Sequence, residues 1–211
     1  MSDSSLSAGS SDGYDALSRI EDLSKYEPGG YYPLEIGEKV HDGRYLILHR
    51  LGHGGYSTVW LAFDQSYDNS TPPDPLRPRY VALKIGAASC GQQEAGLLHE
   101  LQTLLRARPA SSPLPDHHQD ESRHIVTLLD YFQISGPNGS HCCLVTEFLG
   151  PSVAELHRYP GIGGCCMLPL PVARRVALQC AEALAVLHSQ GIVHAGIFHQ
   201  RPSLLSVGFL T

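Results

Sequence analysis

Residues 51–59 read Leu-Gly-His-Gly-Gly-Tyr-Ser-Thr-Val and residues 81–84 read Val-Ala-Leu-Lys, and these two stretches decide the fold. The first is a glycine-rich turn between two β-type runs, and the second belongs to a further strand. Gly52 and Gly54 carry no Cβ, so backbone N–H groups of the turn can approach an anion closely. Lys84 adds a point charge suited to phosphate oxygens. The pattern predicts a phosphate-binding hairpin with a lysine on the neighbouring strand.

The surrounding sequence predicts an antiparallel sheet with a helix against it, which is an α+β arrangement. Runs of β-branched and aromatic residues, separated by connections rich in proline and glycine, indicate five strands and a turn. The predicted strands are residues 44–51, 56–64, 80–85, 125–133 and 141–147, with the turn at 135–139.

Two helices are expected beside this sheet. Leucines spaced by three and four residues indicate an amphipathic helix over residues 92–106. A second helix is predicted over residues 171–190, where a proline opens the segment and Gly191 suits the left-handed position after its end. Its apolar stripe consists of Val172, Val176, Cys180, Leu184 and Leu187.

Charge and composition exclude several classes of partner. The net charge of −6 is opposite to the basic face that nucleic acid requires, so no direct nucleic-acid binding is expected. No run approaches the roughly 20 apolar residues that cross a bilayer, so no membrane partner is expected. The Ser-rich start lacks the basic and apolar parts of a secretory signal, which favours the cytoplasm or the nucleus.

The six cysteines do not have the spacing of a zinc site. Cys142 and Cys143 are adjacent, as are Cys165 and Cys166, whereas zinc ligands are usually spaced as CxxC. Adjacent residues on a strand point to opposite faces and cannot converge on one ion. Free cysteine is common in protein interiors. The pattern favours buried thiols, and no metal site is predicted.

The order of glycine-rich hairpin, lysine strand and helix is similar to the small lobe of a protein kinase. This similarity implies that Val59 covers an adenine ring and that Ala82 lies against it. It also implies a carboxylate on the helix that pairs with Lys84. Glu100 follows the lysine by 100 − 84 = 16 residues and is flanked by leucines, which favours it. Glu94 is the alternative, and the two lie about 120° apart around a helix, so both cannot face the lysine.

Further segments resemble one kinase family, the SR-protein kinases, in particular its fungal branch. These segments are Tyr26-x-x-Gly29-Gly30-Tyr31-Tyr32-Pro33, Ile36-Gly37, Arg44-Tyr45, Ser57-Thr58-Val59-Trp60-Leu61 and residues 131–141. The resemblance covers about residues 26–194. It implies a bilobal kinase fold, ATP with Mg²⁺ as cofactors, serine phosphorylation of Arg/Ser-rich proteins, and residence in the cytoplasm and nucleus.

The resemblance also implies an ATP-binding set. Thr146 would border the back of the adenine pocket, and the backbone around Glu147 and Leu149 would bind the purine edge. The expected ATP-binding residues are Leu51, Gly52, His53, Gly54, Gly55, Tyr56, Ser57, Thr58, Val59, Ala82, Lys84, Glu100, Thr146, Glu147 and Leu149.

The similarity ends at His194, where the catalytic loop should begin. Gly196 stands where the family has its catalytic aspartate, Phe198 where it has a lysine, and Arg201 where it has a metal-binding asparagine. No Asp-Phe-Gly type of triplet follows, and Glu182 is the last acidic residue. Magnesium requires oxygen ligands and a hydroxyl nucleophile requires a base, so no intact catalytic or metal-binding residue is expected.

Five regions follow from these patterns. A Ser/Gly/Asp-rich N-terminal tail has too few large apolar groups to offset the entropy of ordering, so disorder is expected there. An N-terminal arm is expected to pack along the outside of the small lobe, and a tail unlike kinase sequence ends the chain. The regions are residues 1–24 (tail), 25–43 (N-terminal arm), 44–150 (ATP-binding small lobe), 151–195 (partial large lobe) and 196–211 (aberrant C-terminal tail).

The expected function is that of a truncated, ATP-binding serine/threonine kinase-like protein that is inactive alone. The alternative is a non-catalytic interaction module, or pseudokinase fragment, that holds a protein partner with the small-lobe surface or residues 26–33. A third hypothesis is an unstable product, because little would cover the apolar stripe of the helix over 171–190.

Overall fold

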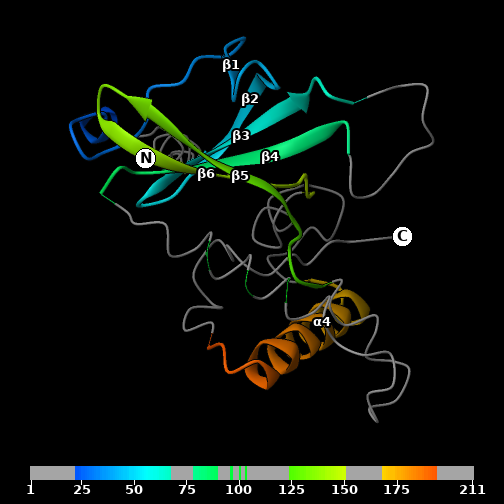
Figure 1. Ribbon diagram of the computed structural model, residues 1–211. Helices are drawn as coiled ribbons and strands as arrows, with labels where there is room; N and C mark the ends of the chain where they lie inside the picture. The colour runs from blue at the N-terminus through cyan, green and yellow to red at the C-terminus, as the bar shows by residue number, and fades with distance from the viewer. Residues whose placement is uncertain are drawn as a thin grey trace, which may run out of the picture.

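The computed structural model describes residues 22–67, 78–89, 96, 100, 103, 124–150 and 168–193. In this part of the chain an antiparallel sheet of six strands, in the order β1-β2-β3-β4-β6-β5, lies above one long helix (Figure 1). The elements are η1 (Leu23–Lys25), β1 (Lys39–Val40), β2 (Tyr45–His53), β3 (Ser57–Asp64), β4 (Tyr80–Gly86), β5 (Leu128–Gly136), β6 (Gly139–Glu147) and α4 (Leu170–Ser189).

The five predicted strands and the α+β fold class are confirmed, with strand ends shifted by at most three residues. The predicted turn is also confirmed: Gly136 pairs with Gly139, so Pro137 and Asn138 form a two-residue connection between β5 and β6. The sequence missed β1, because a pairing of two residues carries no periodic pattern.

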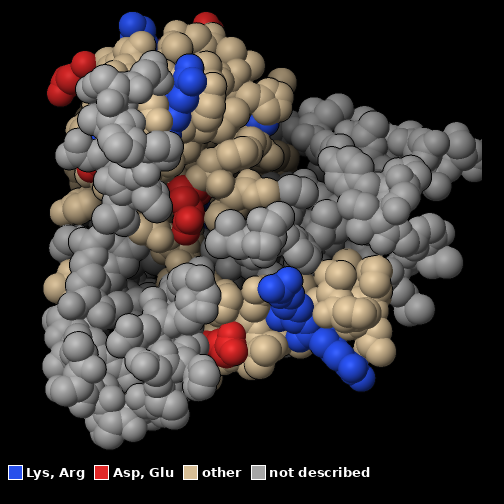
Figure 2. Space-filling view, turned by 90° about the vertical axis from the view of Figure 1, so that its right-hand side faces the viewer, with Lys and Arg blue, Asp and Glu red and all other residues tan. Residues whose placement is uncertain are grey.

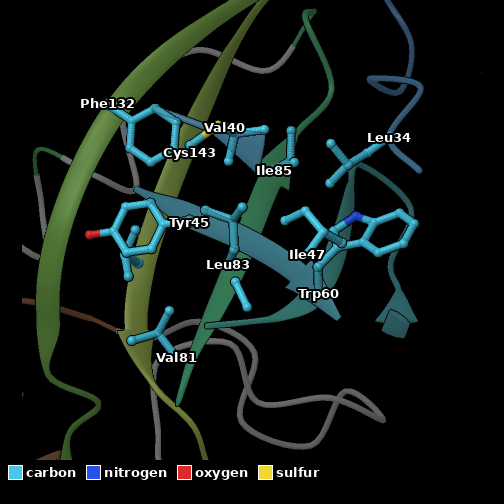
Figure 3. Packing of buried hydrophobic residues seen from close by; sticks show 12 residues of the cluster. Leu34, Val40, Tyr45, Ile47, Trp60, Val81, Leu83, Ile85, Phe132 and Cys143 are labelled. Carbon is cyan, nitrogen blue, oxygen red and sulfur yellow. The ribbon is translucent and has the colours of Figure 1, made fainter. Parts of the chain in front are cut away.

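One face of the sheet carries the main core, because side chains alternate between the two faces along each strand. Figure 3 shows Tyr45 and Ile47 of β2, Trp60 of β3 and Leu83 of β4 pointing into this layer. Cys143 lies in the same cluster as a buried free thiol, and burial raises its pKa to about 12. The expectation of a buried thiol is therefore confirmed at this position.

A network of charged side chains near the start of β2 links it to strands β3 and β5. Arg44 binds Asp64 through Nη2 to Oδ2 at 2.9 Å and Asp130 through Nη1 to Oδ2 at 2.8 Å. The Tyr45 hydroxyl donates to the same Asp130 oxygen at 2.9 Å. Asp64 ends β3 and Asp130 lies in β5, so Arg44 connects two strands that are distant in the sheet order.

Helix α4 confirms the predicted second helix to within one residue at each end, and Gly191 has the left-handed φ of 73° expected after it. Its buried residues Ala183, Val186 and Leu187 pack with Ile125. The predicted stripe is only half-buried from Val172 to Leu184, and Leu187 is its fully buried member. No described helix is long and apolar enough to cross a membrane.

The N-terminal arm packs against the lobe through two buried side chains. Tyr31 is 1% exposed and Leu34 is also buried, whereas Glu27, Pro28 and Pro33 are exposed, so the arm lies on the surface of the lobe and directs these two side chains inward. Residues 22–24, assigned to the disordered tail, begin the described chain, and the Asp22 side chain accepts from Ser24 N at 3.0 Å at the start of η1. Residues 1–21 lie outside the described part.

Several predictions fall mainly outside the described residues. Of the helix expected over 92–106, Gly96, Glu100 and Thr103 are described, and all three are helical. Residues 151–167 and 194–211 are not described, so Gly196 and the rest of the expected catalytic loop stay predictions from sequence.

Candidate nucleotide-binding site

Strand register brings the central predicted residues onto one face of the sheet. Val59 of β3 lies directly opposite Lys84 of β4, and Ala82 lies directly opposite Thr146 of β6. Directly opposed residues share a face, and Ala82 and Lys84 are two positions apart on one strand. All four side chains are half-buried, whereas their strand neighbours on the other face form the core. The sheet therefore has a second face with apolar and cationic groups together.

The glycine-rich turn lies between β2 and β3, where Gly54 N donates to Ser57 O at 2.7 Å. Gly54 and Gly55 do not have positive φ, and a Cβ on Gly55 would meet nothing within 4 Å. The packing of this chain therefore does not require glycine at position 55. Among the described residues, the N–H groups of Gly55 and Tyr56 donate no hydrogen bond. Backbone donors beside open space are what a phosphate group needs at such a turn.

Three predicted residues are positioned differently from the rest. Thr58 is completely buried on the core face, where its Oγ1 accepts from Trp60 Nε1 at 3.0 Å, so only its backbone could serve a nucleotide. Leu51 and Tyr56 are exposed, Tyr56 to 72%. The alternation along β3 already implied this for Thr58, since its neighbour Val59 was assigned to the nucleotide face.

Side-chain hydrogen bonds and packing fix the end of β6 and the segment that follows it. Glu147 Oε1 accepts from Thr127 N at 3.0 Å, so this carboxylate is already engaged within the chain. Thr146 Oγ1 donates to Glu147 O at 3.3 Å, and a carbonyl oxygen can accept a second bond. Leu149 packs beside the buried Leu144. The backbone around Glu147 thus follows a defined path next to Ala82 and Thr146, as purine recognition would require.

Among the described residues, Lys84 and Glu100 do not form the predicted ion pair. Glu100 is helical and exposed, and the ion pairs between described residues do not include one that joins these two side chains. Glu94 lies outside the described residues. Which glutamate serves the lysine therefore stays a prediction.

The sequence did not predict two contacts that the N-terminal arm makes with the glycine-rich turn. The Tyr31 hydroxyl donates to Gly54 O, and Lys25 Nζ lies 3.5 Å from Gly55 O. The Gly29-Gly30-Tyr31 motif was visible in the sequence, but nothing local linked it to a turn more than twenty residues away.

Among the residues that Figure 2 colours by type, Lys and Arg side chains and Asp and Glu side chains are scattered among uncharged residues. Among the described residues, no group of three or more His, Cys, Asp or Glu could hold a metal ion. Lys84 is the cation that the register places on the open face.

Comparison with known proteins gives the relatives of this chain. It is 35% identical over 178 residues to protein kinase dsk1 of Schizosaccharomyces pombe, a match that covers 84% of this chain and 29% of dsk1. It is 35% identical over 187 residues to serine/threonine-protein kinase SRPK of Physarum polycephalum, covering 85% and 38%. For human SRSF protein kinase 3 the identity is 34% over 178 residues, covering 84% and 28%. The chain belongs to the SR-protein kinase family.

The described sheet is accordingly the small lobe of a kinase fold. The chain spans between 14% and 38% of the length of such relatives. No protein-family model matches it. A crystallised kinase domain has a TM-score of 0.49 and 18% identity, covering 78% of this chain and 40% of that chain, a likeness too distant to add weight.

Proposed function

We propose that residues 1–211 bind ATP on the open face of the small lobe and do not by themselves transfer its γ-phosphate. The proposal of ATP binding is supported by the strand register, which sets Lys84 opposite Val59 and Ala82 opposite Thr146. Val59 and Ala82 would enclose adenine, the N–H groups of the glycine-rich turn would bind phosphate oxygens, and Lys84 would neutralise charge there.

The proposal that these residues do not transfer phosphate is based on the residues at the expected catalytic positions. Gly196 offers no base for a hydroxyl proton, and the guanidinium of Arg201 cannot ligate a cation. Magnesium is held by oxygen ligands, and no carboxylate follows Glu182. These residues do not fit the family's metal and base positions, so the 211 residues would bind nucleotide without turnover.

Substrate class and location are part of the same proposal. Family membership supports Arg/Ser-rich proteins as the class of partner, and the composition supports the cytoplasm or nucleus. The alternative function is a non-catalytic module that holds a protein partner with the small-lobe surface or residues 26–33. Within residues 26–33 the Tyr31 side chain is buried and offers no surface to a partner, whereas Glu27, Pro28 and Pro33 are exposed.

The test is nucleotide-dependent thermal stability. We expect ATP to raise the melting temperature of the purified 211-residue protein, because a ligand that binds only the folded state stabilises it. The shift should disappear in Lys84→Ala. Lys39→Ala is the matched control, since Lys39 is an exposed lysine on β1, and it should keep the full shift. No shift in the unaltered protein, or an equal shift in Lys84→Ala, would contradict ATP binding at this face.

Phosphate transfer is tested separately with γ-labelled ATP, Mg²⁺ and an Arg/Ser-repeat peptide. We expect no label on peptide or protein. Labelled serine, in a preparation shown to be free of other kinases, would overturn the proposal that these residues lack transfer activity.

A further inference from the structure

The start of the N-terminal arm folds into a turn that only glycine permits. Gly29 has a left-handed φ of 86°, and Gly30 N donates to Glu27 O at 2.7 Å. A Cβ on Gly30 would lie 2.0 Å from Lys25 O, which no side chain could tolerate. Tyr31 N donates to that same Lys25 carbonyl at 2.7 Å. The two glycines therefore direct the Tyr31 side chain into the lobe, where it is 1% exposed.

The turn is fastened to two other segments of the lobe. Gly29 N donates to Asn138 O at 2.7 Å, and Asn138 Nδ2 donates to Tyr31 O at 2.6 Å. Ser89 N, just beyond β4, donates to Gly29 O at 2.8 Å. In Figure 1 the blue segment around η1 accordingly lies beside the turn that joins β5 and β6. Tyr31 is thus held by the sheet and not only by its own turn.

From this position the arm reaches the glycine-rich turn. The Tyr31 hydroxyl donates to Gly54 O, and Lys25 Nζ lies 3.4 Å from the Tyr31 hydroxyl oxygen and 3.5 Å from Gly55 O. Tyr26 packs edge-on against the Tyr31 ring at 5.6 Å between centroids. A residue outside the hairpin therefore bonds to the carbonyl directly before the Gly55 N–H.

We propose that Tyr31 is a positioning residue for the glycine-rich turn. By this contact the N-terminal arm holds the turn backbone in a conformation that can bind phosphate. The inference rests on the proposed binding of ATP. Gly54 and Gly55 have no side chains to hold them, and the described hydrogen bond within the turn is Gly54 N to Ser57 O. The Tyr31 bond to Gly54 O removes freedom at the peptide whose N–H group would face a phosphate.

The test compares Tyr31→Phe with Tyr45→Phe. Both remove one hydroxyl from a buried tyrosine, but the Tyr45 hydroxyl donates to Asp130 Oδ2, at the other end of β2 from the turn. In nucleotide-free protein we expect faster amide hydrogen exchange at residues 52–57 in Tyr31→Phe and wild-type exchange there in Tyr45→Phe. ATP should bind about three- to tenfold more weakly to Tyr31→Phe, the scale of one hydrogen bond.

Wild-type exchange at residues 52–57 in Tyr31→Phe would overturn the positioning role. If the unaltered protein binds no ATP, the proposed function fails, while exchange without nucleotide still decides whether Tyr31 holds the turn. Lys25→Met is a second variant that keeps the aromatic packing and should raise exchange at Gly54, whose N–H donates to Ser57 O, by a smaller factor. Unchanged exchange there would contradict the Lys25 contact.

Discussion

The two faces of strand β4 differ although they are formed by adjacent residues. Leu83 is completely buried in the main core, whereas Lys84 is half-buried on the face that carries Val59 and Thr146. One face is filled by side chains from the other strands, and the other keeps apolar and cationic groups accessible. Stability and the proposed nucleotide binding should therefore depend on alternate residues of one strand, so mutations should separate them.

The largest expected effect is on the filled face. Leu83→Ala should lower the free energy of unfolding by about 2–5 kcal/mol, because it removes buried methyl groups and leaves a cavity. Urea denaturation of the purified protein measures this. Lys84→Ala, one residue along, should change the unfolding free energy by much less while abolishing the ATP-dependent shift. Equal destabilisation by both variants would show that the two faces are not distinct.

A smaller effect is expected at Asp64, which closes the filled face at the end of β3. Burial opposes ionisation of this carboxyl, but hydrogen bonds from Arg44 and Ser66 outweigh it and hold its pKa below the usual value. The ion pair therefore contributes stability above the unfolded-state pKa of about 3.9, and this is lost as pH falls through the folded-state value. Asp64→Asn should cost about 1–3 kcal/mol at pH 7.

The same pair of proteins gives a pH test. The difference in unfolding free energy between wild type and Asp64→Asn should begin to shrink as pH falls below about 4, where the unfolded-state carboxyl becomes protonated, and should vanish only once pH is below the lower folded-state pKa. Urea unfolding at pH 7, 4 and 3 measures it. A difference that stays constant over this range would mean that the charge of Asp64 contributes nothing.

The smallest effect on stability is expected from filling the open face. Ala82→Leu should change the unfolding free energy by less than about 1 kcal/mol, because the side chain can extend from a half-buried position. ATP should nevertheless bind roughly tenfold more weakly, since the added atoms would occupy the space proposed for adenine. Isothermal titration calorimetry measures the affinity.

Ala62→Leu is the matched control for this change. Ala62 is completely buried on the filled face, so the same added atoms should cost about 1–3 kcal/mol through overpacking. If Ala82→Leu is as destabilising as Ala62→Leu, the face of Ala82 is not open.

The strands and the second helix were predictable because their signals are local. Alternating apolar residues specify which positions of β4 are buried, and proline and Gly191 mark the ends of α4. The same alternation places Lys84 and Ala82 on one face. The motif of glycines at 52 and 54 with Lys84 therefore predicts the candidate site from the sequence alone.

Only the tertiary structure decided what holds the glycine-rich turn. Tyr31 and Gly54 are distant in sequence, and their hydrogen bond exists because Asn138 and Ser89, from two further segments, fasten the turn that carries Tyr31. Local propensity contains no information about such pairings, since they depend on how separate segments pack together. The sequence by itself thus determined which residues can form the site, and packing between distant segments determined how its backbone is positioned.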